Sequence, residues 1–297
     1  MVPTAAVLSR LYATGKYKIR ALTRDTSSNA AKSLVEKYPG VELASASLSD
    51  IASLRQAFKG AHIVFSVTYF HLAANDRDVN YDKEYEHGKN IVDAAIAEGV
   101  ESLVFSSLDS LKANSNGKYP GVMHFESKHR VEEYILSKAN QIRGYFVYVR
   151  FYFENLINSS RLLPEDSTTI EFVFPLKPTT EVPIVDTAND VGAVVSYILD
   201  HPEESLGKAR EVSSGYYTIQ ELVEAFTEAT GIPARYVQIP VEQISNDSLI
   251  RGLKGIEEFG GFNGRSKFIE RNKLLIDHKF ATPVKFWKNR RWTGPAQ

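Results

Sequence analysis

The 297-residue sequence predicts an α/β protein with a doubly wound parallel sheet and a smaller C-terminal α+β lobe. Short β-rich runs alternate with longer helical patterns over roughly the first two hundred residues, joined by short connections. One run, 61–68, is almost continuously apolar, as is typical of a parallel strand buried on both faces. Beyond Phe151 the alternation fades. We therefore expect residues 1–150 to form the first domain, and residues 151–297 to form a smaller lobe interleaved with it.

The chain is expected to begin with a helix rather than a strand. Residues 4–13 have a helical pattern and lead directly into Gly15 and a strand at 17–22. A second helix is expected at 28–37, ended by the Pro-Gly pair that follows it. Residues 41–45 form the next short β-rich run.

Capping and periodicity place the remaining elements of the first domain. Asp50 is a good N-cap for a helix reaching Phe58, because its carboxylate can accept from the first unpaired backbone N–H groups. The buried strand 61–68 comes next. The later elements expected are a helix at 83–98, a strand at 103–105, a helix at 124–137 and a strand at 145–150.

The C-terminal lobe begins with a proline-rich stretch that contains Pro175, Pro178 and Pro183. The elements expected after it are a helix at 190–199, a strand at 209–212, a helix at 218–230 and a strand at 235–239. Residues 285–292 combine basic and aromatic side chains, which we interpret as an amphipathic packing segment with a solvated basic face.

Composition excludes several classes of protein. The 35 basic and 36 acidic residues give a net charge of −1, which predicts no bulk attraction to nucleic acid or to anionic membranes. There are no cysteines, so disulfides, thiolate metal sites and a cysteine nucleophile are excluded. No run approaches the ~18 apolar residues of a membrane span. We expect a cytoplasmic protein, with the nucleus as an alternative location.

Other polar residues are given structural roles. The seven histidines show no metal-ligand spacing, so no metal site is predicted. Asp109, Asp186 and Asp190 are expected to serve as caps or turn residues, and no Ser–His–Asp arrangement follows from spacing. The glycine cluster Gly260, Gly261 and Gly264 follows no predicted strand and is expected to form a surface loop.

The N-terminal segment departs from the usual start of a dinucleotide-binding fold. Such folds open with a strand and a glycine-rich turn, whose backbone holds the pyrophosphate at a helix N-terminus. Here the first glycine, Gly15, follows the first helix. We expect the chain to be a shortened form of a longer protein. The loss of two donors to the pyrophosphate would weaken cofactor affinity by roughly 10²–10⁴.

Several segments resemble the NmrA-like family, atypical members of the short-chain dehydrogenase/reductase superfamily. They occur in the family's order and spacing between about residue 5 and residue 200. The matching segments are Tyr-Lys-Ile-Arg-Ala-Leu-Thr-Arg-Asp (17–25), Ala-His-Ile-Val-Phe-Ser-Val-Thr (61–68), Val-Phe-Ser-Ser-Leu (104–108), His-Phe-Glu-Ser-Lys (124–128), Val-Glu-Glu-Tyr (131–134) and Tyr-Phe-Glu-Asn-Leu (152–156).

This resemblance implies a Rossmann-like fold that binds NADP(H). Arg24 would face the 2′-phosphate, which a planar guanidinium suits. Thr68 would line the cofactor's ribose and nicotinamide side, and Lys128 would reach the nicotinamide ribose. Ser106 or Ser107 would occupy the position of the superfamily's substrate-polarising serine. The nicotinamide end would be walled by Tyr152, Phe153, Glu154 and Asn155.

The superfamily's catalytic Tyr-x-x-x-Lys is His124-x-x-x-Lys128 in this chain. Histidine could donate a proton, with an ordinary pKa of about 6.5, but it does not simply replace a phenol activated by lysine. A structural histidine is the favoured interpretation. If the chain is catalytic, His124 and Lys128 are the candidate catalytic residues.

Three functions remain open. The leading hypothesis is a redox-sensing or regulatory protein that acts through a protein partner, with weakened NADP(H) binding. The second is an NADPH-dependent reductase of a small carbonyl or aromatic substrate. The third is an interaction module without a cofactor. A monomer or weak homodimer is expected, with no direct contact to nucleic acid or membrane.

Overall fold

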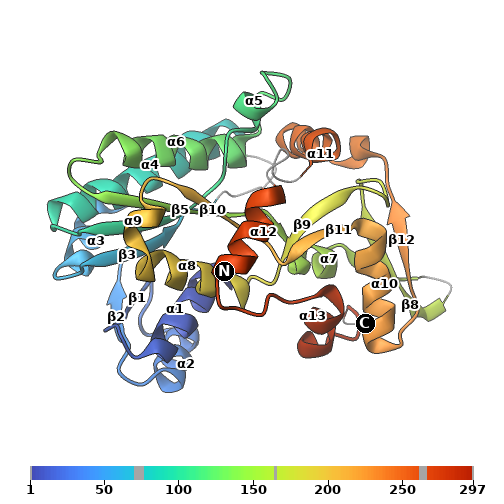
Figure 1. Cartoon of the computed structure of the whole chain (residues 1–297), viewed down its shortest axis with the longest axis horizontal. Helices are drawn as coiled ribbons and strands as arrows, with labels where there is room; N and C mark the ends of the chain where they lie inside the picture. Colours follow the sequence, from blue (N-terminus) through green and yellow to red (C-terminus); the bar gives the residue numbers. More distant parts are fainter. Residues whose placement is uncertain (1, 70–76, 164–165, 261–265, 296–297) are drawn as a thin grey trace. The chain divides into compact units, whose positions relative to one another are not determined.

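A computed structural model describes residues 2–69, 77–163, 166–260 and 266–295. His71, Gly261 and Gly264 therefore lie outside the described residues. The chain forms two compact units (Figure 1). The first comprises Met1–Asp109, Met123–Tyr148 and Val191–Arg210; the second comprises Ser110–Val122, Val149–Asp190 and Glu211–Gln297. Among the described helices, none is both long and apolar enough to cross a bilayer.

The first unit contains a parallel sheet, as the sequence predicts. Strands β3 (Ile63–Val67), β4 (Ser102–Ser107) and β5 (Arg143–Val149) pair in parallel, and β10 (Ala209–Val212) lies beside β5. Figure 1 shows α4 (Arg77–Ala97) and α6 (Met123–Ser137) along one face, with α1 (Val2–Thr14) and α8 (Asp190–Asp200) along the other. The short helix α9 (Pro202–Ser205) follows α8.

A separate two-stranded sheet follows α1. Its parallel strands are β1 (Arg20–Thr23) and β2 (Glu42–Ser45). The helices after these strands are α2 (Asn29–Lys37) and α3 (Ile51–Phe58). Ser28 caps α2 by accepting from the Ala31 amide, and Asp50 caps α3 by accepting from the amides of residues 52 and 53. Side-chain oxygens thus fix both helix starts where the sequence predicts them.

The prediction that strand 61–68 is buried on both faces is wrong. In β3, Val64 and Ser66 are buried, but Ile63 is 38% exposed, and exposed or half-buried residues alternate with the buried ones. The physical reason is the break between the two sheets. Among the described strands, β3 pairs only with β4, so its other edge lacks the neighbour that a central strand needs for burial.

The second unit has two three-stranded sheets. In one, β9 (Glu181–Val185) lies between β11 (Gly215–Thr218) and β6 (Phe151–Tyr152). In the other, β8 (Asp166–Phe174) lies between β12 (Ala234–Gln238) and β7 (Ser160–Leu163). The helices of this unit are α5 (Leu111–Asn114), α7 (Phe153–Asn158), α10 (Ile219–Thr230), α11 (Asp247–Phe259), α12 (Ser266–Leu275) and α13 (Pro283–Arg290), with a short 3₁₀ turn at Val241–Gln243.

Aromatic side chains form the centre of the second unit's core. Phe153, Phe172, Phe226 and Trp287 are fully buried there. Phe153 stacks on Phe286 with ring centroids 4.1 Å apart. Helix α13 thus contributes its apolar side to the core and packs against α10, while Lys285 and Lys288 are exposed.

Helices α1 and α8 approach closely at Gly192. A Cβ atom there would lie 2.5 Å from the Ala6 carbonyl oxygen and 2.8 Å from the Arg10 Cβ atom. Glycine-to-alanine changes inside helices normally stabilise by roughly 0.5–1 kcal/mol. We expect Gly192→Ala to lower the free energy of unfolding by about 1–3 kcal/mol instead, because the helices must move apart. Urea unfolding measures it, and a gain in stability would contradict the close approach.

Candidate functional site

A buried polar cluster lies where β3, α4 and α6 meet; we call Thr68, Glu84, Ser127 and Lys128 the Lys128 cluster. Thr68 follows β3, Glu84 lies on α4, and Ser127 and Lys128 lie on α6. The Lys128 ammonium donates to the Thr68 carbonyl at 2.7 Å, to its Oγ1 at 3.1 Å and to Glu84 Oε1 at 2.6 Å. Three protein acceptors therefore surround a group that has three protons.

Glu84 is the centre of this cluster. Its side chain is 1% exposed, while that of Lys128 is 14% exposed. Besides Lys128, its Oε1 accepts from Thr68 Oγ1 at 2.8 Å, and its Oε2 accepts from Ser127 Oγ. A carboxylate removed from water in this way requires both a counter-charge and hydrogen bonds, and here it has both. Residue types and spacing alone gave no signal for Glu84, which the structure adds to the predicted site residues.

His124 lies one helical turn before Lys128 on α6. Its ring packs edge-on against Phe125, with centroids 4.8 Å apart, and its Nδ1 is enclosed. Burial lowers the pKa of His124 to about 4; Glu84 opposes the shift and Lys128 adds to it. The imidazole is therefore neutral at pH 7, where it is a poor proton donor.

Acid sensitivity follows from the lowered pKa of His124. The unfolded chain takes up this proton near pH 6.5 and the folded chain only near pH 4, so acidification favours unfolding. We expect a loss of at most about 3 kcal/mol between these pH values and no effect of this group above pH 7. His124→Gln should reduce the acid sensitivity measured by urea unfolding at several pH values. His62→Gln, at an exposed site, is the control; an equal change in both variants would contradict the assignment.

Two serines end strand β4 at the same edge of the sheet. Val67 and Ser106 are register partners, so Thr68 and Ser107 follow at neighbouring strand ends. Ser106 and Ser107 are buried, and Ser107 Oγ lies 3.4 Å from the Lys128 carbonyl oxygen. The carboxyl ends of parallel strands are where α/β sheets bind ligands.

Arg24 lies on the loop after β1. The residue is exposed, and its carbonyl accepts from Ser45 Oγ at 3.3 Å. Its guanidinium forms no ion pair within the described part of the chain. The structure thus places a cation at the carboxyl end of β1, with no hydrogen bond to the Lys128 cluster.

Residues 152–155 belong to the second unit, where they end β6 and begin α7. Burial, with a contribution from Glu154, raises the pKa of Tyr152 to about 12, so its phenol stays protonated. Glu154 Oε1 accepts from Thr187 Oγ1 at 3.0 Å. Phe153 is a fully buried core residue, whereas Glu154 and Asn155 are half-buried. Their role beside a nicotinamide remains a prediction.

A further buried cluster in the second unit joins Asp190, Ser214 and His278. Asp190 Oδ1 lies 2.8 Å from His278 Nε2, and Oδ2 accepts from Ser214 Oγ at 2.6 Å. Because the carboxylate lies between the other two, the serine is not bonded to the histidine as a nucleophile would be. This cluster joins residues 24 and 88 positions apart from Asp190, and sequence spacing could not reveal it.

Comparison with protein families decides the assignment. The NmrA-like family model matches residues 4–289. The chain belongs to the NmrA-like family. The match covers nearly the whole chain and confirms the resemblance seen in the six sequence segments.

Relatives of this chain include an oxidoreductase and a repression protein. The chain is 26% identical over 272 residues to the NmrA-like family domain-containing oxidoreductase ptmS of Penicillium ochrochloron, covering 87% of this chain and 79% of that protein. It is 30% identical over 199 residues to the nitrogen metabolite repression protein nmr of Neurospora crassa, covering 64% of this chain but 38% of that protein.

A solved structure agrees with the fold. The crystal structure of NmrA, a negative transcriptional regulator, in complex with NADP has a TM-score of 0.74 at 20% identity. The alignment covers 97% of this chain and 91% of that chain. The Rossmann-like α/β fold predicted from the sequence is confirmed.

Proposed function

We propose that this NmrA-like protein is a redox-sensing regulator that binds NADP(H) weakly and acts through a protein partner. The main support for the proposal is that the Lys128 ammonium already donates to three acceptors within the protein, two on Thr68 and one on Glu84. A reductase of this superfamily needs that lysine to activate a proton donor. The neighbouring His124 is neutral at pH 7 and a poor acid.

The residues fit part of an NADP(H) site. Arg24 offers an exposed guanidinium at the end of β1, which suits a 2′-phosphate and favours NADP(H) over NAD(H). Thr68 follows β3 at the carboxyl edge of the sheet, where a ribose would bind, and the Lys128 ammonium reaches it from α6. The bound cofactor would supply a hydride donor.

A reductase is the second candidate, favoured by one observation. Ser107 Oγ, at the carboxyl end of β4, lies 3.4 Å from the Lys128 carbonyl oxygen on α6, and His124 lies one turn earlier on that helix, so a substrate carbonyl nearby could meet hydrogen-bond donors. The oxidoreductase description of the Penicillium relative supports this alternative. A third possibility is an interaction module without a cofactor.

Titration of the chain with NADPH and with NADH, monitored by calorimetry, tests the proposal. We expect a Kd for NADPH of about 0.1–10 mM, with NADH bound more weakly. Arg24→Ala should remove the preference for NADPH, whereas Lys32→Ala, which removes an exposed cation on α2, should preserve it. No binding up to about 10 mM would favour the interaction module.

Turnover separates the regulator from the reductase. With a panel of carbonyl and enone substrates, the proposed regulator should consume no NADPH. Consumption that Lys128→Ala abolishes would establish the reductase instead. Micromolar NADPH binding would remove the argument for a weakened site.

A further inference from the structure

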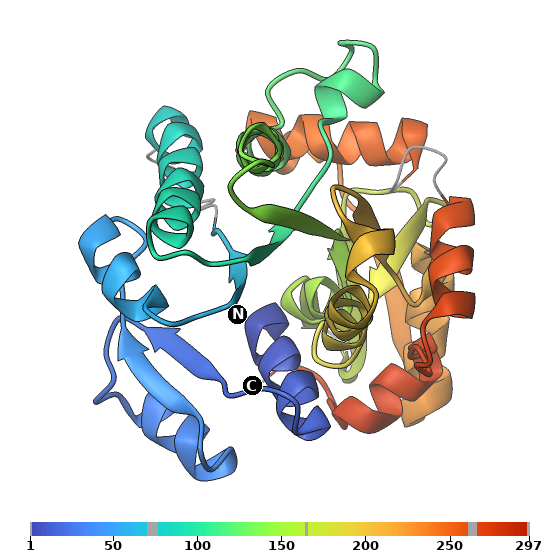
Figure 2. The same ribbon diagram turned by 60° about the vertical axis from the view of Figure 1, so that its left-hand side comes forward.

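A small cavity lies in the second unit, at the carboxyl ends of the parallel strands β8 and β12. Its volume is about 230 Å³, and it is lined by the segments that follow both strands and by residues of α11. In Figure 2, α11 is the orange helix along the top of this unit. Because α/β sheets bind ligands at the carboxyl ends of parallel strands, this position favours a ligand site.

Prolines and a tyrosine hold the walls of the cavity in place. Pro175 follows β8 directly, and Pro240 lies two residues after β12. Each proline fixes its own φ angle. The Tyr236 hydroxyl, on β12, lies 2.9 Å from the Phe174 carbonyl oxygen and 2.5 Å from that of Leu176, and so ties the two segments together. The cavity is therefore largely preformed, as ligand sites usually are.

Apolar side chains make up much of the lining. Leu176 and Leu253 are buried, while Ile239 and Val241 are half-buried. The volume of the cavity is below the ~300–1,000 Å³ of sites that hold drug-sized ligands. We therefore expect a ligand with an aliphatic portion of only a few carbon atoms.

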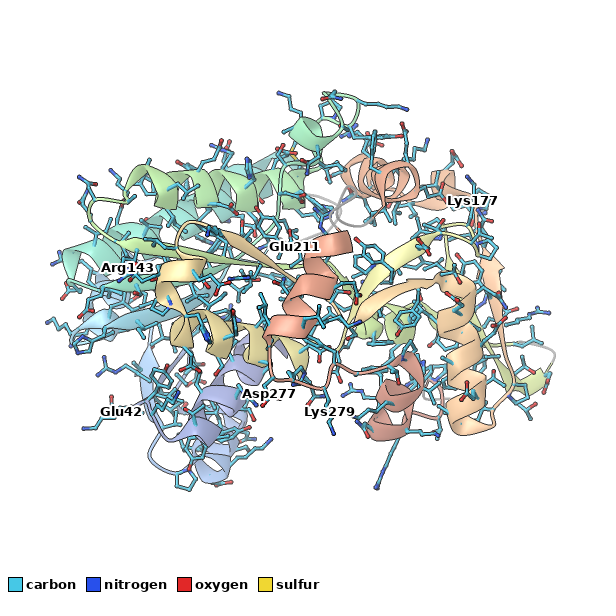
Figure 3. All side chains as sticks on the ribbon, viewed as in Figure 1. Glu42, Arg143, Lys177, Glu211, Asp277 and Lys279 are labelled. Carbon is cyan, nitrogen blue, oxygen red and sulfur yellow. The ribbon has the colours of Figure 1, made fainter. Side chains whose placement is uncertain are left out.

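A carboxylate lies beside these apolar residues. The Glu257 side chain is 24% exposed, and its Oε1 accepts from the Lys177 amide at 2.8 Å and from Thr180 Oγ1 at 3.4 Å (Figure 3). Its Oε2 lies 3.8 Å from Lys177 Nζ, which is beyond hydrogen-bond distance. Within the described residues this second oxygen accepts no hydrogen bond. It is oriented by the first and can accept from the ammonium group of a ligand.

Lys254 provides the complementary cation. It lies one turn before Glu257 on α11, so the two side chains are neighbours on one face of the helix. The Lys254 ammonium is 3.9 Å from Glu242 Oε1, and its side chain is 48% exposed. An exposed pair at this distance contributes little, and in the described part of the chain the ammonium donates no hydrogen bond. It can therefore donate to the carboxylate of a ligand.

We propose that this cavity binds a small aliphatic α-amino acid in its zwitterionic form. The ligand ammonium would bind Glu257, its carboxylate would bind Lys254, and its side chain would lie against Leu176 and Leu253. A simple amine or carboxylic acid would leave one of the two charged groups of α11 without a partner. The inference goes beyond the proposed function, since it requires neither the cofactor nor a protein partner.

The test is a titration of the full chain with L-leucine, monitored by NMR of ¹³C-labelled Ile, Leu and Val methyl groups. We expect a Kd of about 0.1–3 mM and the largest shifts at Leu176, Ile239, Val241 and Leu253. N-acetyl-L-leucine lacks the ammonium, and L-leucine methyl ester lacks the carboxylate. Each should bind about tenfold or more weakly than L-leucine.

Variants of the charged residues locate the two contacts. Glu257→Gln should weaken binding of L-leucine about tenfold or more. Lys254→Met changes an exposed side chain, so it guards against misfolding, and it should weaken binding about fivefold or more. The matched controls are Glu228→Gln on α10 and Lys285→Met on α13, at exposed positions outside the lining. Both controls should bind L-leucine as the unmodified chain does.

Three results would overturn the proposal. The first is the absence of shifts at the four lining residues up to about 20 mM L-leucine. The second is equal binding of L-leucine and its two blocked analogues, which would show an apolar cavity that does not recognise the zwitterion. The third is unchanged binding in both Glu257→Gln and Lys254→Met.

Discussion

Replacement of Trp287 by alanine is expected to lower the free energy of unfolding of the second unit by about 3–5 kcal/mol. The side chain is fully buried, and its ring lies 5.0–6.4 Å, between centroids, from the aromatic rings of residues 153, 172, 226, 286 and 292. Alanine would leave a cavity bounded by rigid rings, which cannot collapse easily. We therefore place Trp287 among the most sensitive core positions.

The measurement is urea unfolding monitored by circular dichroism. Fluorescence is unsuitable because Trp287 is one of two tryptophans and its loss changes the signal. Trp287→Phe should cost less than alanine, since it keeps a ring and removes an indole N–H that has no partner within the described residues. Lys288→Ala, on the exposed side of the same helix, is the control and should change stability by less than about 0.5 kcal/mol. Equal losses in both alanine variants would contradict the assignment of the Trp287 effect to core packing.

Local signals in the sequence predicted much of the first unit. Ser28 and Asp50 are caps at the predicted helix starts, because an N-cap depends only on residues within one turn. The strand at 209–212 was also placed correctly. In the second unit, the basic and aromatic residues of 285–292 correctly predicted a packing segment with a solvated basic face, most of which lies on helix α13.

Predictions from the sequence were wrong where the structure depends on which strands pair with each other. Pro183 lies inside β9, although the proline-rich stretch was not predicted to contain a strand. A proline is tolerated there because β6 pairs only at residues 184 and 185, so no β6 partner requires the missing N–H. The predicted burial of β3 on both faces was wrong for a related reason. The periodicity of apolar residues does not show whether another strand pairs with each edge of β3.

The candidate site was predictable only in part. Thr68, His124 and Lys128 came from the family resemblance, and the structure places them in one unit. Glu84 was missed because α4 brings it to Lys128 from 44 residues away, a separation without a local signal. The contribution of this carboxylate can be measured directly.

Glu84→Ala is expected to lower the free energy of unfolding by about 3–5 kcal/mol, the usual effect of removing one partner of a buried ion pair. The variant leaves the Lys128 ammonium with only the two Thr68 oxygens and leaves Ser127 without its acceptor. Glu84→Gln should cost less, because it preserves hydrogen bonding while removing the charge. Urea unfolding of both variants measures the difference.

The double variant Glu84→Leu, Lys128→Leu separates the ion pair from simple packing. Apolar residues can replace a buried pair at little cost, so the double variant should be more stable than Glu84→Ala. A loss below about 1 kcal/mol in Glu84→Ala would show that the ammonium turns to solvent when its partner is removed. In that case Lys128 would be available to a ribose, and NADPH should bind Glu84→Ala more tightly than the unmodified chain. Unchanged or weaker NADPH binding would instead show that Glu84 does not compete with the cofactor for Lys128.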